Sequence, residues 1–177
     1  MFSLYFVSGT KGFIKKAEIA GIILLGLLLV LGSCSTSSAD DTNYPGVLPD
    51  GLIGTWSFDG TNADRYTIDS DTIKHEMVWE SDDYGFTGTI SFVSNYSSSS
   101  GVIIFEYSSG DFITPGTYDA VYYRDLTPTT VKLADAINLN DFSSSATATL
   151  DQAVAKFTRG NWGKFVNWGG VMTQTKE

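Results

Sequence analysis

The chain has 177 residues and a formal net charge of −9, from 20 Asp and Glu against 11 Lys and Arg. A surface of that sign repels the phosphate backbone of nucleic acids, which excludes nucleic-acid binding as a function. One cysteine and one histidine exclude an internal disulfide, an HExxH zinc site and most metal sites built from several histidines.

The first element in chain order is an apolar run over residues 19 to 31, preceded by Lys11, Lys15 and Lys16. The run is thirteen residues long and uncharged. A helix that spans a bilayer takes about 20 apolar residues. The run therefore predicts a signal peptide over residues 1–33 rather than a transmembrane helix.

The only cysteine follows this run directly. Leu31, Gly32, Ser33 and Cys34 together resemble the lipobox of bacterial lipoproteins. The resemblance implies cleavage before Cys34 and acyl chains on its thiol and new amino group, which together hold a protein stably on a membrane. It also implies a lipid anchor in the bacterial cell envelope, and Ser35 beside the lipidated residue fits the outer membrane. The alternatives are an uncleaved anchor and a buried core cysteine.

The segment after the cysteine is polar, holds two prolines and lacks apolar periodicity. Residues 34–50 therefore predict a lipidated cysteine followed by a flexible tether. Without residues 1–33, 8 Lys and Arg remain against 19 Asp and Glu, so the net charge falls to −11. Residues 51–177 are sufficient for one domain and leave no room for a second.

From Leu52 onward, apolar residues recur with a period of two, which indicates β-strands. Ile73, His75 and Met77, for example, share one face of a strand. Turn signals separate such runs at intervals of roughly ten residues, which is typical of an antiparallel meander. We expect seven strands near residues 53–59, 63–69, 72–80, 86–94, 101–107, 117–124 and 129–134.

One helix is expected late in the chain, within residues 149–160, where apolar residues fall at helical spacing. Thr149 and Gln152 can form a capping box at its start. Residues 161–172 then predict the eighth strand. The expected fold class is all-β: a single antiparallel meander of about eight strands, closed into a small barrel, with the helix before the last strand.

Gly54, Thr55 and Trp56 at the head of the first strand resemble the Gly-x-Trp signature of lipocalins and other calycins, whose order of elements is also similar. The resemblance implies structural roles for Gly54 and Trp56, with the tryptophan closing one end of a calycin-like barrel and a small apolar ligand entering at the other. The family often places an arginine over this tryptophan, for which the chain offers Lys164 or Arg159. Another barrel or a sandwich is the alternative.

No constellation for catalysis is present in the sequence. The carboxylate pairs Asp69 with Asp71 and Asp82 with Asp83 fall in predicted turns, where Asp is favoured for backbone reasons. No nucleophile elbow or glycine-rich loop between a strand and a helix occurs. We therefore expect no catalytic residue, metal or cofactor, and no enzyme activity. A calcium ion at Glu80, Asp82 and Asp83 is an alternative, although their spacing matches no defined loop.

Aromatic side chains are the one compositional excess, with 20 among the 144 residues from Cys34 onward. The candidate ligand-binding residues are Trp79 and His75 on one strand and Tyr118, Tyr122 and Arg124 on another. If they line a barrel pocket, they favour a small apolar or amphipathic ligand. If they lie on the outer wall, they favour a protein partner.

Two functions remain open at this point. The first is a membrane-anchored interaction or surface module with a lipocalin-like fold. The alternative is a lipocalin-like binding protein for a small apolar or amphipathic ligand. A pocket predicts that Tyr122 and Arg124 are shielded from solvent, whereas a docking face predicts that they are exposed.

Overall fold

The computed structural model describes residues 45–58, 64–79, 82–141 and 143–177. The predicted signal peptide and Cys34 lie outside the described residues, as does the side chain of Trp79. None of the helices in the described ranges has the length and hydropathy that a bilayer crossing requires.

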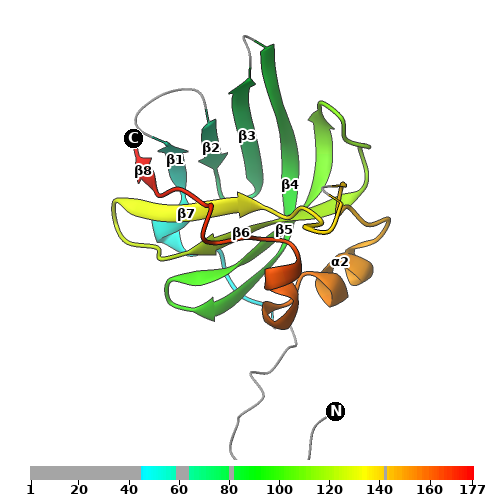
Figure 1. Ribbon diagram of the computed structural model, residues 1–177. Helices are drawn as coiled ribbons and strands as arrows, with labels where there is room; N and C mark the ends of the chain where they lie inside the picture. Colours follow the sequence, from blue (N-terminus) through cyan, green and yellow to red (C-terminus); the bar gives the residue numbers. More distant parts are fainter. Residues whose placement is uncertain (1–44, 59–63, 80–81, 142) are drawn as a thin grey trace, which may run out of the picture. The chain divides into compact units, whose positions relative to one another are not determined.

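Eight antiparallel strands close a barrel, in which each strand pairs with its neighbours along the chain and β8 pairs with β1 (Figure 1). This confirms the predicted all-β meander and the small calycin-like barrel. The strands are β1 (Gly54–Ser57), β2 (Asp64–Ile68), β3 (Thr72–Trp79), β4 (Asp82–Ser97), β5 (Ser100–Gly110), β6 (Tyr118–Arg124), β7 (Thr130–Asp135) and β8 (Gln174–Lys176).

The longest strands, β4 and β5, are paired with three irregularities in register, one of them between Thr87 and Gly88. Such bulges bend a strand and increase its twist, which helps a sheet close on itself. A Cβ atom on Gly88 would lie 2.4 Å from Cδ2 of Phe105. Glycine at this position therefore leaves room for the Phe105 ring inside the barrel.

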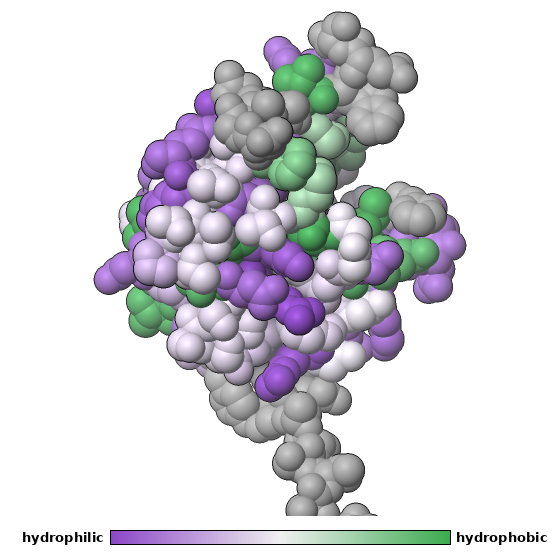
Figure 2. Space-filling view, turned by 60° about the vertical axis from the view of Figure 1, so that its left-hand side comes forward, coloured by the Kyte–Doolittle hydropathy of each residue, from purple (hydrophilic) through white to green (hydrophobic). Residues whose placement is uncertain are grey.

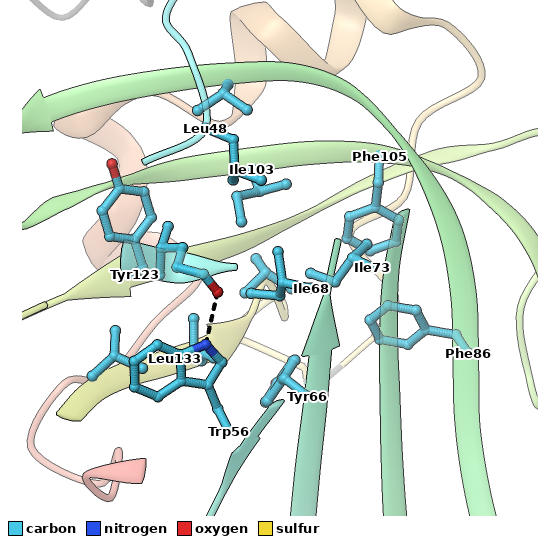
Figure 3. Close-up of a cluster of buried hydrophobic side chains, with 14 of the residues drawn as sticks. Leu48, Trp56, Tyr66, Ile68, Ile73, Phe86, Ile103, Phe105, Tyr123 and Leu133 are labelled. Atoms are coloured by element: carbon cyan, nitrogen blue, oxygen red, sulfur yellow. Dashed lines mark hydrogen bonds between the residues drawn. The ribbon is translucent and has the colours of Figure 1, made fainter. Parts of the chain in front are cut away.

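The inside of the barrel is filled with large side chains, several of them fully buried (Figure 3). Trp56 is one of these, and its indole N–H donates to the carbonyl oxygen of Leu52 at 2.8 Å, the dashed line in Figure 3. This hydrogen bond satisfies the one polar group that the ring brings into the core. Other side chains of this cluster are Tyr66, Ile68, Ile73, Phe86, Ile103, Phe105, Val121 and Tyr123.

A second apolar layer lies on the outer wall. Helix α2 (Leu150–Lys156) contacts β5 and β6, and the 3-10 helix η2 (Arg159–Lys164) follows it. Ala153 and Phe157 pack with Ala120 and Tyr122 in this layer. Residues of β6 are thus buried on both faces, which explains why its burial is continuous rather than alternating. The hydroxyl of Thr149 accepts the Gln152 N–H at 3.3 Å, which confirms Thr149 as the N-cap, the first half of the predicted capping box.

The prediction of a strand over residues 161–172 is wrong. The stretch begins within η2 and continues as turns, and the eighth strand is the three-residue β8. The local cause is a turn at Asn167, whose carbonyl and side-chain oxygens accept the N–H groups of Gly170 and Gly169. Phe165 and Val166 join the outer apolar layer instead of alternating across a sheet.

The described chain enters at one end of the barrel, which we call the closed end (residues 46–52). Leu48 and Leu52 are buried there, and the Gly46 N–H donates to the carbonyl oxygen of Val93 at 2.8 Å. The 3-10 helix η1 (Asp50–Leu52) leads into β1. The packed domain thus begins before residue 51, within the segment predicted as tether.

Candidate functional site

The opposite end of the barrel holds a pocket of about 340 Å³, which we call the mouth pocket. Turns of an antiparallel meander alternate between its two ends, so the β3–β4 turn, the β5–β6 loop and the end of β7 all come together here. Figure 2 shows a hollow at the upper end of this face, with hydrophobic side chains along its wall. The pocket is lined by His75, Met77, Tyr84, Gly85, Phe86, Asp111, Phe112 and Asp135.

The loop after β5 is held to β4 at this pocket. The Asp111 N–H donates to the carbonyl oxygen of Gly85 at 2.9 Å, and the Gly85 N–H donates to Oδ2 of Asp111 at 3.1 Å. A Cβ atom on Gly85 would lie 2.2 Å from the carbonyl oxygen of His75, so no larger residue fits there. A second hollow, of about 380 Å³, adjoins the mouth pocket here and extends over outer-wall residues such as Lys74 and Glu76.

An ionic cluster forms the base of the mouth pocket. His75 is buried and contacts two carboxylates, with Nε2 at 2.9 Å from Oδ1 of Asp64 and Nδ1 at 2.8 Å from Oδ2 of Asp135. The Tyr66 ring stacks on the imidazole at a centroid distance of 4.0 Å, and its hydroxyl donates to Oδ1 of Asp135 at 2.8 Å. Because both ring nitrogens face carboxylate oxygens, both carry a proton and the ring is an imidazolium.

The electrostatics of the cluster agree with that assignment. Burial acts to lower the pKa of His75, but the charge and hydrogen bonds of Asp135 and Asp64 outweigh it and raise the pKa to about 10. Burial, followed by the charges of the same two carboxylates, raises the pKa of Tyr66 well above its ordinary value. At neutral pH the histidine is therefore charged and the tyrosine neutral.

In contrast to the half-buried Asp64 and Asp135, the carboxylate of Asp119, on the inner face of β6, is buried. Asp119 accepts hydrogen bonds from the hydroxyls of Tyr107 at 3.1 Å and Ser145 at 2.7 Å, and from the Ala120 N–H at 2.9 Å. Burial raises the pKa of Asp119 to about 6, although these hydrogen bonds oppose the increase. All of its near partners are thus donors, and Asp119 is satisfied without any further ligand.

The rim of the mouth pocket is apolar and exposed. Phe112 has 92% of its surface exposed and a positive φ of 56°, and its ring centroid lies 5.8 Å from that of Tyr84. Met77 and Val78 of β3 are exposed as well. Large apolar side chains that remain in solvent beside a pocket are typical of a surface that contacts another molecule.

The candidate ligand-binding residues of β6 do not line the mouth pocket. Odd-numbered residues of this strand, such as Tyr123, face the inside of the barrel, and even-numbered ones face outward. Tyr122 is fully buried in the outer layer below α2, and Tyr118 donates to Glu106 at 3.0 Å. The Arg124 side chain is 44% exposed, and its guanidinium lies 5.8 Å from the centroid of the Trp168 ring. Tyr122 is therefore shielded and Arg124 is exposed, and neither lines the mouth pocket.

Of the predicted ligand residues with described side chains, only His75 lines the mouth pocket. Sequence reasoning missed Asp64, Asp135, Tyr84 and Phe112, which come from four separate segments. Asp64 and Asp135 do stand at strand ends on the same side of the meander. That signal is weak, because nothing in the pattern shows that barrel closure brings β2 and β7 to one imidazole.

Gly54 and Trp56, the residues of the Gly-x-Trp signature, both contact Lys176 of β8. Gly54 has a φ of 139°, and a Cβ atom on it would lie 2.7 Å from Cε of Lys176. The glycine therefore makes room for Lys176, whose ammonium lies 5.2 Å from the centroid of the Trp56 ring. The expectation that Lys164 or Arg159 provides this cation is wrong, because the last strand lies further along the chain than predicted.

The part of the chain that the structure describes contains no group of three or more His, Cys, Asp or Glu side chains arranged to bind a metal ion. Asp64 and Asp135 contact opposite nitrogens of the His75 ring, so the three side chains do not converge on one point. The alternative calcium site consisted of Glu80, Asp82 and Asp83. Asp82 and Asp83 are the first residues of β4, and Glu80 lies outside the described residues.

Comparison of the chain with models of protein families, with curated proteins and with solved structures gives no match. The assignment to a calycin-like barrel therefore rests on its strand topology. Folds of this kind host unrelated functions, so any function has to follow from the chemistry of the mouth pocket.

Proposed function

We propose that this chain is a lipid-anchored binding protein of the bacterial cell envelope that holds one small amphipathic molecule in the mouth pocket. The observation that carries the proposal is the pocket itself: about 340 Å³, with an apolar rim and an ionic base. Ligand sites in proteins have volumes of roughly 300 to 1,000 Å³ and combine apolar walls with a few converging polar groups.

The volume limits the size of the ligand. The pocket would hold roughly eleven water molecules at ~30 Å³ each, which corresponds to a ligand of about ten non-hydrogen atoms. Deeper entry is blocked, because Ile73, Phe105 and Tyr107 fill the barrel below. A long acyl chain therefore does not fit, whereas a single ring or a short branched chain does.

Binding is favoured over catalysis by the state of His75. A general base needs a pKa near the working pH and an available lone pair. Both nitrogens of this imidazole are protonated and bound to carboxylates, so the ring has neither. The cluster is suited to fixing charge at the base of the pocket rather than to moving protons.

The lipid anchor rests on the lipobox-like residues Leu31 to Cys34. Residues 35–44 lie between this cysteine and the described domain, and their polar composition is that of a tether. The chain then joins the barrel at the closed end, where Gly46 and Leu48 are held. The mouth pocket lies at the opposite end, so a domain tethered in this way can expose the mouth away from the lipid surface.

The anchor is tested by replacing Cys34→Ser and following a radiolabelled fatty acid in the producing cell. We expect the label on the original chain only, together with loss of the variant from the membrane fraction or its retention as an uncleaved precursor. Label on the serine variant would overturn the proposed anchor.

The pocket is tested with the full chain in lipid nanodiscs and the neutral fluorophore alpha-naphthylamine, which is about as large as the pocket allows. We expect saturable binding at one site per chain. A Met77→Trp substitution fills the pocket and should weaken binding about tenfold or more, since a bulky ring removes the space for the ligand.

Met172→Trp is the matched control. Met172 is also exposed, but it lies in the segment before β8 and not at the mouth. This variant should bind the fluorophore like the original chain. Binding that is not saturable, or that responds equally to both substitutions, would refute the proposed site.

The exposed rim also favours a second function, an interaction module that docks a protein partner at the mouth. Phe112 supports this alternative, because its ring is 92% exposed and lines the same pocket as the exposed Met77, so it offers an apolar anchor for an interface. In that case Phe112→Ser should abolish co-purification of the partner from the envelope of the producing cell, whereas Met172→Ser should not.

A further inference from the structure

The charges around the mouth pocket set the kind of ligand that it can hold. Asp111 and Asp135 line the pocket, and Asp64 reaches its base through His75. The imidazolium of His75 is the one cation among the described lining residues, and two carboxylates already bind it. Negative charge therefore remains in excess at the pocket.

Arg65 and Lys74 line the adjoining hollow but not the mouth pocket itself. Both residues lie on the outer wall, where their side chains contact Glu76 at 2.8 and 2.6 Å. No lysine or arginine is among the described residues that line the mouth pocket. An anionic ligand, such as a short fatty acid, would face unscreened carboxylates in a partly desolvated site.

Both lining carboxylates can accept further hydrogen bonds. Asp135 is 37% exposed and accepts one bond at each oxygen, from Tyr66 and from His75. Asp111 is exposed and accepts the Gly85 N–H at Oδ2. Each carboxylate oxygen has about two lone-pair directions, so both groups keep capacity for a donor on the ligand.

Aromatic rings stand beside these carboxylates. The rings of Tyr84 and Phe112 line the pocket, with centroids 5.8 Å apart and planes tilted by 33°. Ring faces attract cations through the quadrupole of the π system, and they also bind apolar groups. A ligand with a cationic head and an apolar body satisfies the carboxylates and the rings at the same time.

We infer that the ligand of the mouth pocket is an organic monocation: a protonated amine on a small apolar body, with its ammonium at Asp111 and Asp135 and its body against Tyr84 and Phe112. This inference rests on the proposed function and adds the chemical class of the ligand. Phosphorylated compounds, fatty acids and other anions are excluded as ligands by the same charges.

The experiment is calorimetric titration of the full chain in nanodiscs of uncharged lipid with three compounds that share one ring and a similar length. These are phenethylammonium, neutral phenethyl alcohol and anionic phenylacetate. We expect the ammonium compound to bind about tenfold or more tightly than the alcohol, and the anion not to bind.

Asp111→Asn tests the assigned carboxylate, because the amide keeps the acceptor for Gly85 but removes the charge. This variant should weaken binding of the ammonium compound several-fold and that of the alcohol much less, and the remaining binding of the alcohol shows that the pocket is intact. Asp151→Asn on helix α2, where the carboxylate is exposed and far from the mouth, is the matched control and should change neither.

The outcomes separate the two proposals. If the alcohol or the anion binds as tightly as the ammonium compound, the cation assignment is overturned while the binding site stands. If alpha-naphthylamine binds but the ammonium compound does not, the cation assignment is again overturned. If neither binds, the proposed binding function fails and the assignment fails with it.

Discussion

The ammonium group of Lys176 lies 5.2 Å from the centroid of the Trp56 ring, and the two residues are also register partners between the last strand and the first. The same ammonium donates to the carbonyl oxygen of Gly51 at 3.3 Å. One side chain thus connects β8, β1 and the turn of η1. β8 has only three residues, and this contact adds to the backbone pairing by which it joins β1 and β7.

Lys176→Ala should therefore reduce the free energy of unfolding by about 1 kcal/mol, the size of a partly desolvated cation–π contact. Urea unfolding followed by tryptophan fluorescence measures the loss. Lys176→Arg should restore most of it, since a guanidinium also stacks on an indole. Lys164→Ala, which removes an exposed contact with Asn161, should have little effect. A larger loss in this control than at Lys176 would contradict the assignment.

The single histidine makes a second prediction easy to read, because its resonances need no assignment. Against the effect of burial, Asp135 and Asp64 raise the pKa of His75 to about 10, so the ring should stay protonated at pH 8. The stability contributed by this raised pKa is present in full below pH 6.5 and is lost as the pH rises through 10. Imidazole chemical shifts recorded over that range measure the titration, and a midpoint near 6.5 would disprove the ionic cluster.

Asp119 gives a third prediction, on how stability changes with pH below neutrality. Burial raises its pKa from 3.8 to about 6, so its contribution to stability is present below pH 3.8 and is lost as the pH rises through 6. Relative to an Asp119→Asn variant, the original chain should therefore gain up to about 3 kcal/mol between pH 7 and pH 4. Thermal unfolding of both proteins across that range gives the difference. A constant difference between them would mean that Asp119 is not a desolvated carboxylate.

The adjacent tyrosines of β6 form a matched pair. The hydroxyl of Tyr122 is buried and has no hydrogen-bond partner among the described residues, whereas the hydroxyl of Tyr123 donates to Asn95 at 2.5 Å. Tyr122→Phe should therefore be neutral or stabilising, and Tyr123→Phe should cost about 1 kcal/mol. Unfolding in urea compares the two variants. The reverse order would show that Tyr122 has a partner, such as an ordered water.

Tyr122→Phe also reports on function. Since this hydroxyl lies in the outer layer under α2, its removal should leave ligand binding at the mouth unchanged. A change in affinity for phenethylammonium would place the ligand at the residues that the sequence favoured instead.

Period-two alternation and the turn signals between the runs together predicted the seven strands up to residue 135, although β6 is buried on both faces and its burial does not alternate. The same reasoning failed after α2, where Phe165 and Val166 have the composition of a strand but pack on the outer wall. The turn at Asn167, with Gly169 and Gly170, interrupts that stretch locally, and the strand that does join the sheet is the three-residue β8.

By itself, the sequence determined the acidic charge, the all-β class and the helix with its cap at Thr149. These features depend on residues that are close together along the chain. Only the tertiary structure decided which face of β6 looks into the barrel, because Tyr122 and Tyr123 are equally apolar and both faces are covered. It also decided the mouth pocket, where closure of the barrel brings Asp64, His75 and Asp135 together from three strands that no local pattern connects.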